Sequence, residues 1–185
     1  FVYGPRAELY TRLRVTDDYN PVSCRLAEQW FETCARDTFC ATMANAGVPD
    51  YMEVAGAAAL PIMLYIVPQF TGVELPIEAV VKLSVHGNII GIKESSGDVN
   101  KIGLMVRETP DDFQVLSGSA NSFLSAREVG AVGGIMALAN IAAGPLADLM
   151  RYFHAGNSER AADIQRSLIV PNNAVTAKFG VAGLK

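Results

Sequence analysis

The sequence predicts an α/β fold in which helices cover a parallel sheet. From about residue 61 onward, short apolar runs alternate with segments of helical period. Candidate strands begin near residues 62, 89, 114 and 132. This spacing is close to the ~31 residues of one strand–helix unit in an eight-stranded α/β barrel. The 185 residues are 50% hydrophobic and 18% charged, which is enough to bury a core in about one domain.

The first two strands are the most clearly marked. Pro61–Val67 (PIMLYIV) lacks polar alternation and is bounded by prolines, as is typical of a buried parallel strand. A turn is expected at Gln69–Pro76. Ile77–His86 follows as a helix, because its apolar residues share one face and a proline stands at its start. The second strand is Asn88–Lys93.

The same alternation continues after a polar turn at residues 95–98, which we expect to cap a second helix with apolar residues at 99, 102, 105 and 106. The later elements are predicted as strand Phe113–Leu116, helix Ser122–Val129, strand Val132–Leu138, and helices Pro145–His154 and Ser158–Ile169. Residues 1–60 contain no clear strand, although Leu26–Met43 has the pattern of a helix.

Charge and hydropathy exclude two classes of partner. The chain has 15 basic and 19 acidic residues, a net charge of −4, so it lacks the cations that nucleic-acid binding requires. Two prolines interrupt the apolar stretch Val54–Pro68, and polar residues interrupt Val129–Met150, so neither predicts a membrane span.

Three cysteines are an odd number for a disulfide framework, which favours a reducing compartment.

Lys93 is the first candidate for chemistry. It ends an apolar parallel strand directly before a Ser/Gly turn, at the edge of the sheet where α/β folds place their active sites. Apolar surroundings lower the pKa of an amine, and the free amine can attack a carbonyl to form a Schiff base. The competing interpretation is a lysine whose ammonium extends from a strand end into water.

Three further residues are expected beside Lys93. Tyr65 lies near the carboxyl end of the preceding strand, about 4.8 Å away, where its phenol can relay protons. Ser95 and the turn around Gly118 supply hydroxyl and backbone N–H groups that favour a carboxylate. The competing interpretations are a core tyrosine with a satisfied hydroxyl and serines that only cap helices.

Several other kinds of site are excluded. His86 and His154 are the only histidines, too few for a histidine-rich metal site or a Ser/His/Asp triad, and we expect both at the surface. The GAVGG run at residues 130–134 does not spell a dinucleotide-binding loop. Its glycines are expected to allow close packing of a strand. The sequence thus predicts no metal and no cofactor.

Three motifs carry a family resemblance: LYIVPQFTG around Tyr65, IIGIKESSGD around Lys93 and VLSGSA around Gly118. Together they resemble the dihydrodipicolinate synthase/N-acetylneuraminate lyase family, whose members are (β/α)8 barrels and class I aldolases. The resemblance implies that Lys93 forms an imine with a 2-oxo acid, that Tyr65 transfers protons, and that Ser95 and Gly118 contact the substrate. It also implies a homo-oligomer if the chain is complete. No metal is implied, because the protonated imine is itself the electron sink.

Within that family, GIKESSGDVNKIGL, GAVGGIMALAN and PNNAVTAKFGVAGLK are most similar to the mitochondrial branch that cleaves 4-hydroxy-2-oxoglutarate to pyruvate and glyoxylate. This similarity implies a carbon–carbon lyase in mitochondria, with the cytoplasm as the alternative location. Dihydrodipicolinate synthesis and sialate cleavage remain open. So does a catalytically silent protein that binds a homologue or itself through open sheet edges.

The resemblance covers about residues 49–185, and four strands cannot close an eight-stranded barrel. We therefore expect residues 51–185 to form the C-terminal half of a TIM barrel, about strands 5 to 8, after an atypical and partly helical region at residues 1–50. The family's early glycine-rich, carboxylate-holding loop has no counterpart, and Ile66 stands where Asn or Ser is usual. These departures predict a fragment, an alternative splice product or a faulty gene model.

Overall fold

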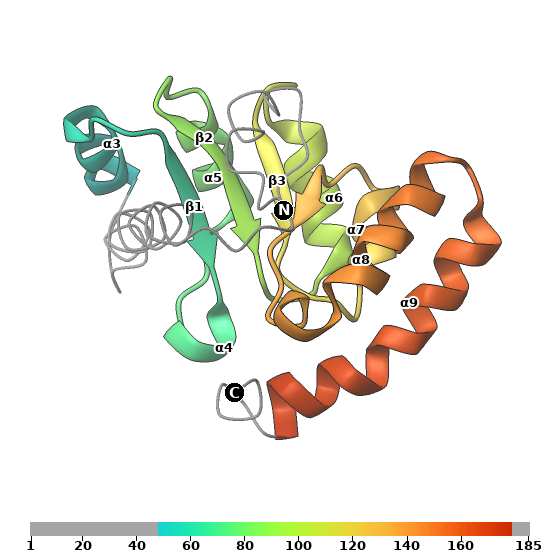
Figure 1. The fold of residues 1–185 in the computed structure, drawn as a ribbon. Coiled ribbons are helices and arrows are strands. Elements are labelled where there is room, and N and C mark those ends of the chain that lie inside the picture. The colour runs from blue at the N-terminus through green and yellow to red at the C-terminus, as the bar shows by residue number, and fades with distance from the viewer. Residues whose placement is uncertain (1–47, 179–185) are drawn as a thin grey trace, which may run out of the picture.

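The computed structural model describes residues 48–178, which form an α/β unit around one four-stranded sheet (Figure 1). The strands lie side by side in chain order, and each pairs with its neighbour in parallel. They are β1 (Ile62–Ile66), β2 (Ile89–Glu94), β3 (Gln114–Ser117) and β4 (Gly133–Gly134). The predicted α/β class, with a parallel sheet that makes up only part of a barrel, is confirmed.

Helices connect the strands and extend the unit on one side (Figure 1). They are α3 (Val48–Ala57), α4 (Pro68–Thr71), α5 (Ile77–Ser84), α6 (Val99–Glu108), α7 (Phe123–Glu128), α8 (Ala139–His154) and α9 (Ser158–Asn173), followed by a π-helical segment at Ala174–Lys178. The short helix α4 lies beyond the arrowhead of β1, at the carboxyl edge of the sheet. Across residues 48–178, no helix combines the length and apolarity that a membrane crossing requires.

Alternation along the strands separates two faces of the sheet. Leu64, Ile92 and Val115 share one face and pack against α5 and α6 in a buried core. Tyr65 and Lys93 pair in register on the opposite face. The amphipathic helices α5 and α6 therefore cover one face of the sheet and leave this pair on the other.

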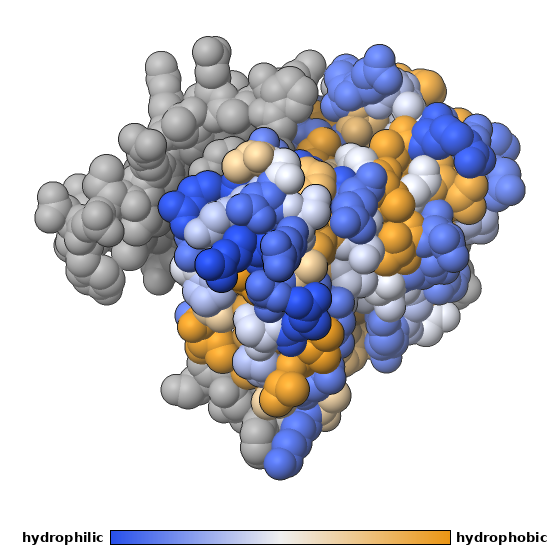
Figure 2. Space-filling model, turned by 90° about the vertical axis from the view of Figure 1, so that its right-hand side faces the viewer, coloured by the Kyte–Doolittle hydropathy of each residue, from blue (hydrophilic) through white to orange (hydrophobic). Residues whose placement is uncertain are grey.

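A second apolar cluster joins α7, α8 and α9. Its most buried members include Phe123, Leu138, Leu149, Ala161 and Leu168. Several hydrophobic patches, separated by hydrophilic side chains, are visible on the face of the molecule beside α9 (Figure 2). Residues 48–178 thus form a sheet with its covering helices and a neighbouring helical layer.

Two local features support β2 and the helix that follows it. Gly91 pairs with Gln114, and a Cβ atom at Gly91 would lie 2.3 Å from the Gln114 carbonyl oxygen, so only glycine fits there. Asp98 caps α6 by accepting hydrogen bonds from the backbone N–H groups of Asn100 (2.9 Å) and Lys101 (3.1 Å). The predicted capping turn at residues 95–98 is confirmed.

The fourth strand is shorter than predicted. Val132–Leu138 was expected to be extended, but β4 covers only Gly133–Gly134, and ladder bonding ends where the N–H of Ile135 donates to the Ser117 carbonyl (2.9 Å). The chain then turns, because Met136 and Leu138 pack into the cluster of α8 and α9 instead of the sheet. Burial against those helices overrides the apolar pattern of a strand.

Other boundaries also differ. A short helix, α4, occupies part of the predicted turn Gln69–Pro76 and ends at Gly72, whose φ of 65° favours glycine. Helix α8 begins six residues before Pro145, with a kink at Ala142 (φ −134°) ahead of the proline. Helix α9 continues past Ile169 to Asn173. The predicted helix Leu26–Met43 lies outside the described residues.

Candidate active site

Lys93 and Tyr65 form the centre of the candidate site at the carboxyl edge of the sheet. Their Cα positions pair across β1 and β2, and the Lys93 Nζ lies over the Tyr65 ring, 4.1 Å from its centroid. Within residues 48–178, the amine makes no hydrogen bond to the Tyr65 hydroxyl. The two side chains are therefore together, as the sequence predicts, but the phenolic oxygen reaches the amine only if one of them rotates.

Burial changes the acidity of Lys93. Loss of hydration lowers the pKa of its amine from 10.5 to about 8. The Tyr65 ring face favours the charged ammonium, so it opposes this change but is outweighed by burial. A fall of this size raises the fraction of free amine at neutral pH by a factor on the order of 300. Lys93 is thus poised to act as a nucleophile.

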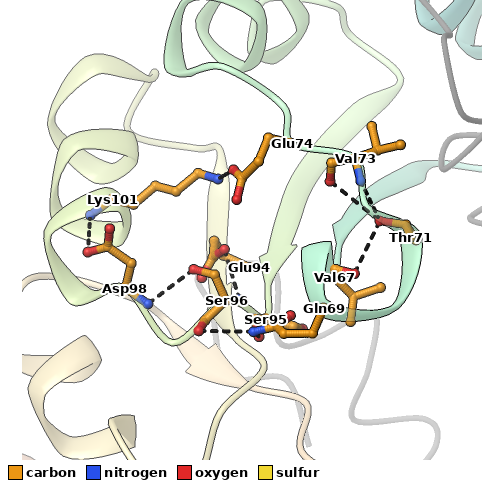
Figure 3. Close-up of polar contacts among 10 residues, drawn as sticks. All are labelled: Val67, Gln69, Thr71, Val73, Glu74, Glu94, Ser95, Ser96, Asp98 and Lys101. Carbon is orange, nitrogen blue, oxygen red and sulfur yellow. Dashed lines mark hydrogen bonds and ion pairs between the residues drawn. The ribbon is translucent and has the colours of Figure 1, made fainter.

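Lys93 also differs from the neighbouring lysine at the same edge of the sheet. Lys101, in the first turn of α6, forms an ion pair with Glu74 (Figure 3). Within the described part of the chain, no carboxylate pairs with Lys93. A carboxylate partner would hold the amine in its charged form, so its absence leaves burial as the dominant influence on Lys93.

The backbone joins the three strand ends around the pair. The N–H of Ser95 donates to the Ile66 carbonyl (2.9 Å), and the N–H of Gly118 donates to the Glu94 carbonyl (2.7 Å). These bonds continue the parallel ladder one residue beyond β2 and β3. The turns that follow Lys93 and Ser117 are therefore held side by side.

Ser95 and Gly118 meet at this point. A Cβ atom at Gly118 would lie 1.9 Å from the Ser95 Oγ, so a side chain at residue 118 would collide with the serine. The Ser95 Oγ is buried and has no hydrogen-bond partner among the described residues. Buried hydroxyls are normally paired, so the Ser95 Oγ is a polar atom whose usual partner the described residues do not supply.

Two residues of the site are not predicted from the sequence. Glu94 is fully buried (0% exposed), and its Oε1 accepts a hydrogen bond from the Ser96 N–H (3.0 Å). Gln69, from α4, donates through Nε2 to the carbonyls of Ser95 and Ser96, each at 3.1 Å (Figure 3). A carboxylate inside an apolar strand was a visible signal for Glu94. Nothing in the sequence singled out Gln69.

The two histidines differ in their exposure. His86 is half-buried rather than at the surface, because its Nδ1 accepts the Asn88 N–H (3.2 Å) in a tight turn. His154 is exposed, as predicted, and its Nε2 lies 3.2 Å from the Arg127 guanidinium. Across the described residues, no group of three His, Cys, Asp or Glu side chains could hold a metal. Close packing of the glycine run is confirmed at Gly134, where a Cβ would lie 2.8 Å from the Ser117 oxygen.

Comparison with known proteins gives a consistent family. The family model described as "Dihydrodipicolinate synthetase family" matches residues 39–185. A curated 4-hydroxy-tetrahydrodipicolinate synthase from Listeria innocua is 34% identical over 134 residues, which cover 68% of this chain and 46% of the relative. The chain therefore spans about half the length of the curated relatives it matches.

Solved structures show the same relationship. A protein of Thermus thermophilus that is assigned to the dihydrodipicolinate synthases is 39% identical, with a TM-score of 0.68, and the match covers 72% of this chain and 46% of that one. Dihydrodipicolinate synthase DapA-2 from Bacillus anthracis is 29% identical, also with a TM-score of 0.68, over 70% and 44% of the two chains. These relatives favour the alternative of dihydrodipicolinate synthesis over the predicted cleavage of 4-hydroxy-2-oxoglutarate.

Proposed function

Because the chain belongs to the dihydrodipicolinate synthetase family, we propose that it carries the Schiff-base half of an active site that acts on pyruvate or a similar 2-oxo acid. The observation that supports this most directly is the Lys93 amine, whose pKa burial lowers to about 8 beside the Tyr65 ring. A free amine of this kind condenses with a ketone, whereas an ammonium cannot. The proposed reaction class is carbon–carbon bond formation or cleavage through an imine.

The proposed chemistry uses the residues at the strand ends. The Lys93 nitrogen attacks the keto carbon of the 2-oxo acid, and loss of water leaves a protonated imine. The methyl carbon of the imine then loses a proton to give an enamine, which attacks an aldehyde; the reverse order cleaves the product. The Tyr65 side chain rotates to bring its phenolic oxygen toward Lys93, and the phenol then relays the protons of imine and enamine formation by donating its own proton as it takes up another. The Ser95 hydroxyl and the turn at Gly118 bind the carboxylate of the 2-oxo acid.

For the second substrate we propose an amino aldehyde, as in a synthase that forms a hydroxylated tetrahydrodipicolinate. The curated relatives named as 4-hydroxy-tetrahydrodipicolinate synthases support this choice. The second candidate is cleavage of 4-hydroxy-2-oxoglutarate, which the motif similarity around Lys93 favours. Both reactions include an imine between Lys93 and pyruvate, and they differ in the aldehyde and in the direction of the carbon–carbon step.

A trapping experiment tests the imine. Incubation with pyruvate and sodium borohydride should reduce the imine to a stable secondary amine on Lys93, detected as an added mass on the peptide that contains it. Lys93→Ala should abolish this adduct, whereas Lys101→Ala, which removes the ion-paired lysine of α6, should retain it. Labelling of other lysines in preference to Lys93 would refute the proposed role.

A second measurement separates the two candidate reactions. With the imine formed, addition of glyoxylate or of an amino aldehyde should consume pyruvate only for the aldehyde that the protein accepts. Consumption with the amino aldehyde alone supports the synthase, and consumption with glyoxylate alone supports the aldolase. If a complete homologue reacts and this chain neither labels nor consumes pyruvate, the interpretation as a catalytically silent interaction protein gains support.

A further inference from the structure

The turn after Lys93 is held from two sides by residues that take no part in the proposed chemistry. On the face of the sheet covered by helices, the Glu94 carboxylate accepts the Ser96 N–H (3.0 Å). From α4, the Gln69 amide donates to the carbonyls of Ser95 and Ser96. The two contacts meet at Ser96, and Gln69 also contacts Ser95 (Figure 3).

Glu94 is an unfavourable residue for stability alone. Its side chain is fully buried, and its Oε2 makes no hydrogen bond within residues 48–178. A buried carboxylate oxygen without a partner costs free energy that an apolar residue would not. The one hydrogen bond that the Glu94 side chain makes within the described residues fixes the turn. We therefore attribute the presence of a buried carboxylate at residue 94 to this contact with the Ser96 N–H.

The turn has to be fixed because Ser95 has little room. Its Oγ lies against Gly118, where even a methyl group would collide, and this hydroxyl has no partner of its own among the described residues. A shift of the turn by a fraction of an ångström would move the hydroxyl away from the place where a ligand carboxylate would lie. Binding groups must keep their geometry closely to be effective.

We propose that Gln69 and Glu94 are positioning residues, which clamp the Ser95–Ser96 turn and thereby set the affinity of the site for the carboxylate of a 2-oxo acid. This inference rests on the proposed function in its choice of ligand. Because Gln69 belongs to the helix after Tyr65 and Glu94 to the strand of Lys93, the clamp also joins the loops that follow the two reacting residues.

Gln69 offers the sharper test, since its side chain is exposed and its loss should leave the core intact. Gln69→Ala removes both bonds to the turn, and Gln69→Glu keeps the size but replaces the donating amide with a carboxylate. The control is Phe70→Ala, the next residue of α4, whose side chain is 86% exposed. Glu94→Gln, which retains an oxygen that can accept the Ser96 N–H, should behave like the unaltered protein.

The readout is the dependence of borohydride trapping at Lys93 on pyruvate concentration. We expect both Gln69 variants to raise the concentration for half-maximal trapping by about five- to tenfold, the effect of losing two ordinary hydrogen bonds. The trapping rate at saturating pyruvate and its pH profile should not change. An unchanged half-maximal pyruvate concentration in the Gln69 variants would overturn the proposal. An equal rise in Phe70→Ala would also overturn it. So would a loss of trapping rate at saturating pyruvate that parallels a loss of thermal stability in the same variants.

Hydrogen–deuterium exchange tests the clamp without any chemistry. Gln69→Ala should speed exchange in the peptide that spans the turn after Lys93, and Phe70→Ala should not. If the unaltered chain fails to label at Lys93, the proposed function fails, and exchange alone decides whether the clamp exists. Equal exchange in the unaltered chain and in Gln69→Ala would refute it.

Discussion

At the scale of single residues, burial and the Tyr65 ring act in opposite directions on the pKa of the Lys93 amine. Burial disfavours the ammonium, and the aromatic face favours it. Burial dominates, so the folded state holds the Lys93 amine at a lower pKa than the unfolded chain does. The nucleophile therefore costs stability, and the cost depends on pH.

Replacement of Lys93 by Met should stabilise the protein at neutral pH. Between about pH 8 and the ordinary lysine value of 10.5, the unfolded chain binds more protons than the folded chain, so the stability of the unaltered protein rises with pH across this window. We expect Lys93→Met to raise the free energy of unfolding by about 2 kcal/mol at pH 7. This gain should shrink as the pH approaches 10.5.

Urea denaturation at several pH values between 7 and 10.5 measures this effect, with Lys82→Met as the control for loss of an exposed amine from α5. A gain that stays constant or grows with pH would contradict the assigned cause.

The Tyr65 hydroxyl has a separate test. Tyr65→Phe keeps the ring under the Lys93 amine and removes only the oxygen that would carry protons. We expect trapping of the pyruvate imine to slow by about 100-fold, the lower end of the usual contribution of general acid–base catalysis. Protein stability should change little. Rapid-quench mass spectrometry gives the rate, and an unaltered rate would limit Tyr65 to packing.

At the scale of elements, strand spacing depends on glycines at specific positions. The Gly91–Gln114 approach lets β2 and β3 pair directly beneath the site, and the Gly118–Ser95 approach lets the turns beyond these strands touch. Close backbone approach of this kind excludes a Cβ atom. The carboxyl edge of the sheet is therefore sensitive to changes that add a single methyl group.

Gly91→Ala is expected to destabilise the protein by about 2 kcal/mol, because the new methyl group would meet a backbone carbonyl that cannot move without disturbing the sheet. Gly144→Ala in α8 is the matched control, since nothing lies within 4 Å of its Cβ position and alanine is the better helix former. Thermal unfolding compares the two variants. Equal unfolding temperatures for Gly91→Ala and Gly144→Ala would contradict this prediction, because they would mean that β2 and β3 can move apart with little loss of stability.

At the scale of the whole molecule, the described residues leave both edges of the sheet without a strand partner. In the order β1-β2-β3-β4, the outer strands pair on one side only. In β1, the Ile62 N–H and the Ile66 carbonyl bond toward β2, so alternation turns the backbone groups of Met63 and Tyr65 outward. Among residues 48–178 these groups have no strand partner, and backbone groups left open in this way are templates for pairing with another chain.

We expect the protein to self-associate through the β1 edge in a concentration-dependent way. Met63→Pro removes one outward N–H without removing a bond to β2, so it should weaken association while the site still forms. Size-exclusion chromatography with light scattering measures the mass over a range of concentrations. A monomer at every concentration, or association that Met63→Pro leaves unaffected, would exclude this edge as the interface.

The order of the strands, their parallel direction and the positions of Lys93 and Tyr65 at neighbouring strand ends follow from the sequence. Apolar runs at a regular spacing specify buried parallel strands, and alternation then determines which side chains share a face. The short β4 and the early start of α8 were not predictable in this way. Packing of Met136 and Leu138 against distant helices decides them.

The tertiary structure alone decided how the site is supported and how the amine behaves. Gln69 contacts the Ser95–Ser96 turn across 26 and 27 residues of chain, and no local pattern records such a contact. The lowered pKa of Lys93 likewise depends on how many neighbouring atoms exclude water. Sequence specifies what each residue can do, whereas desolvation and long-range contacts exist only once the chain has folded around it.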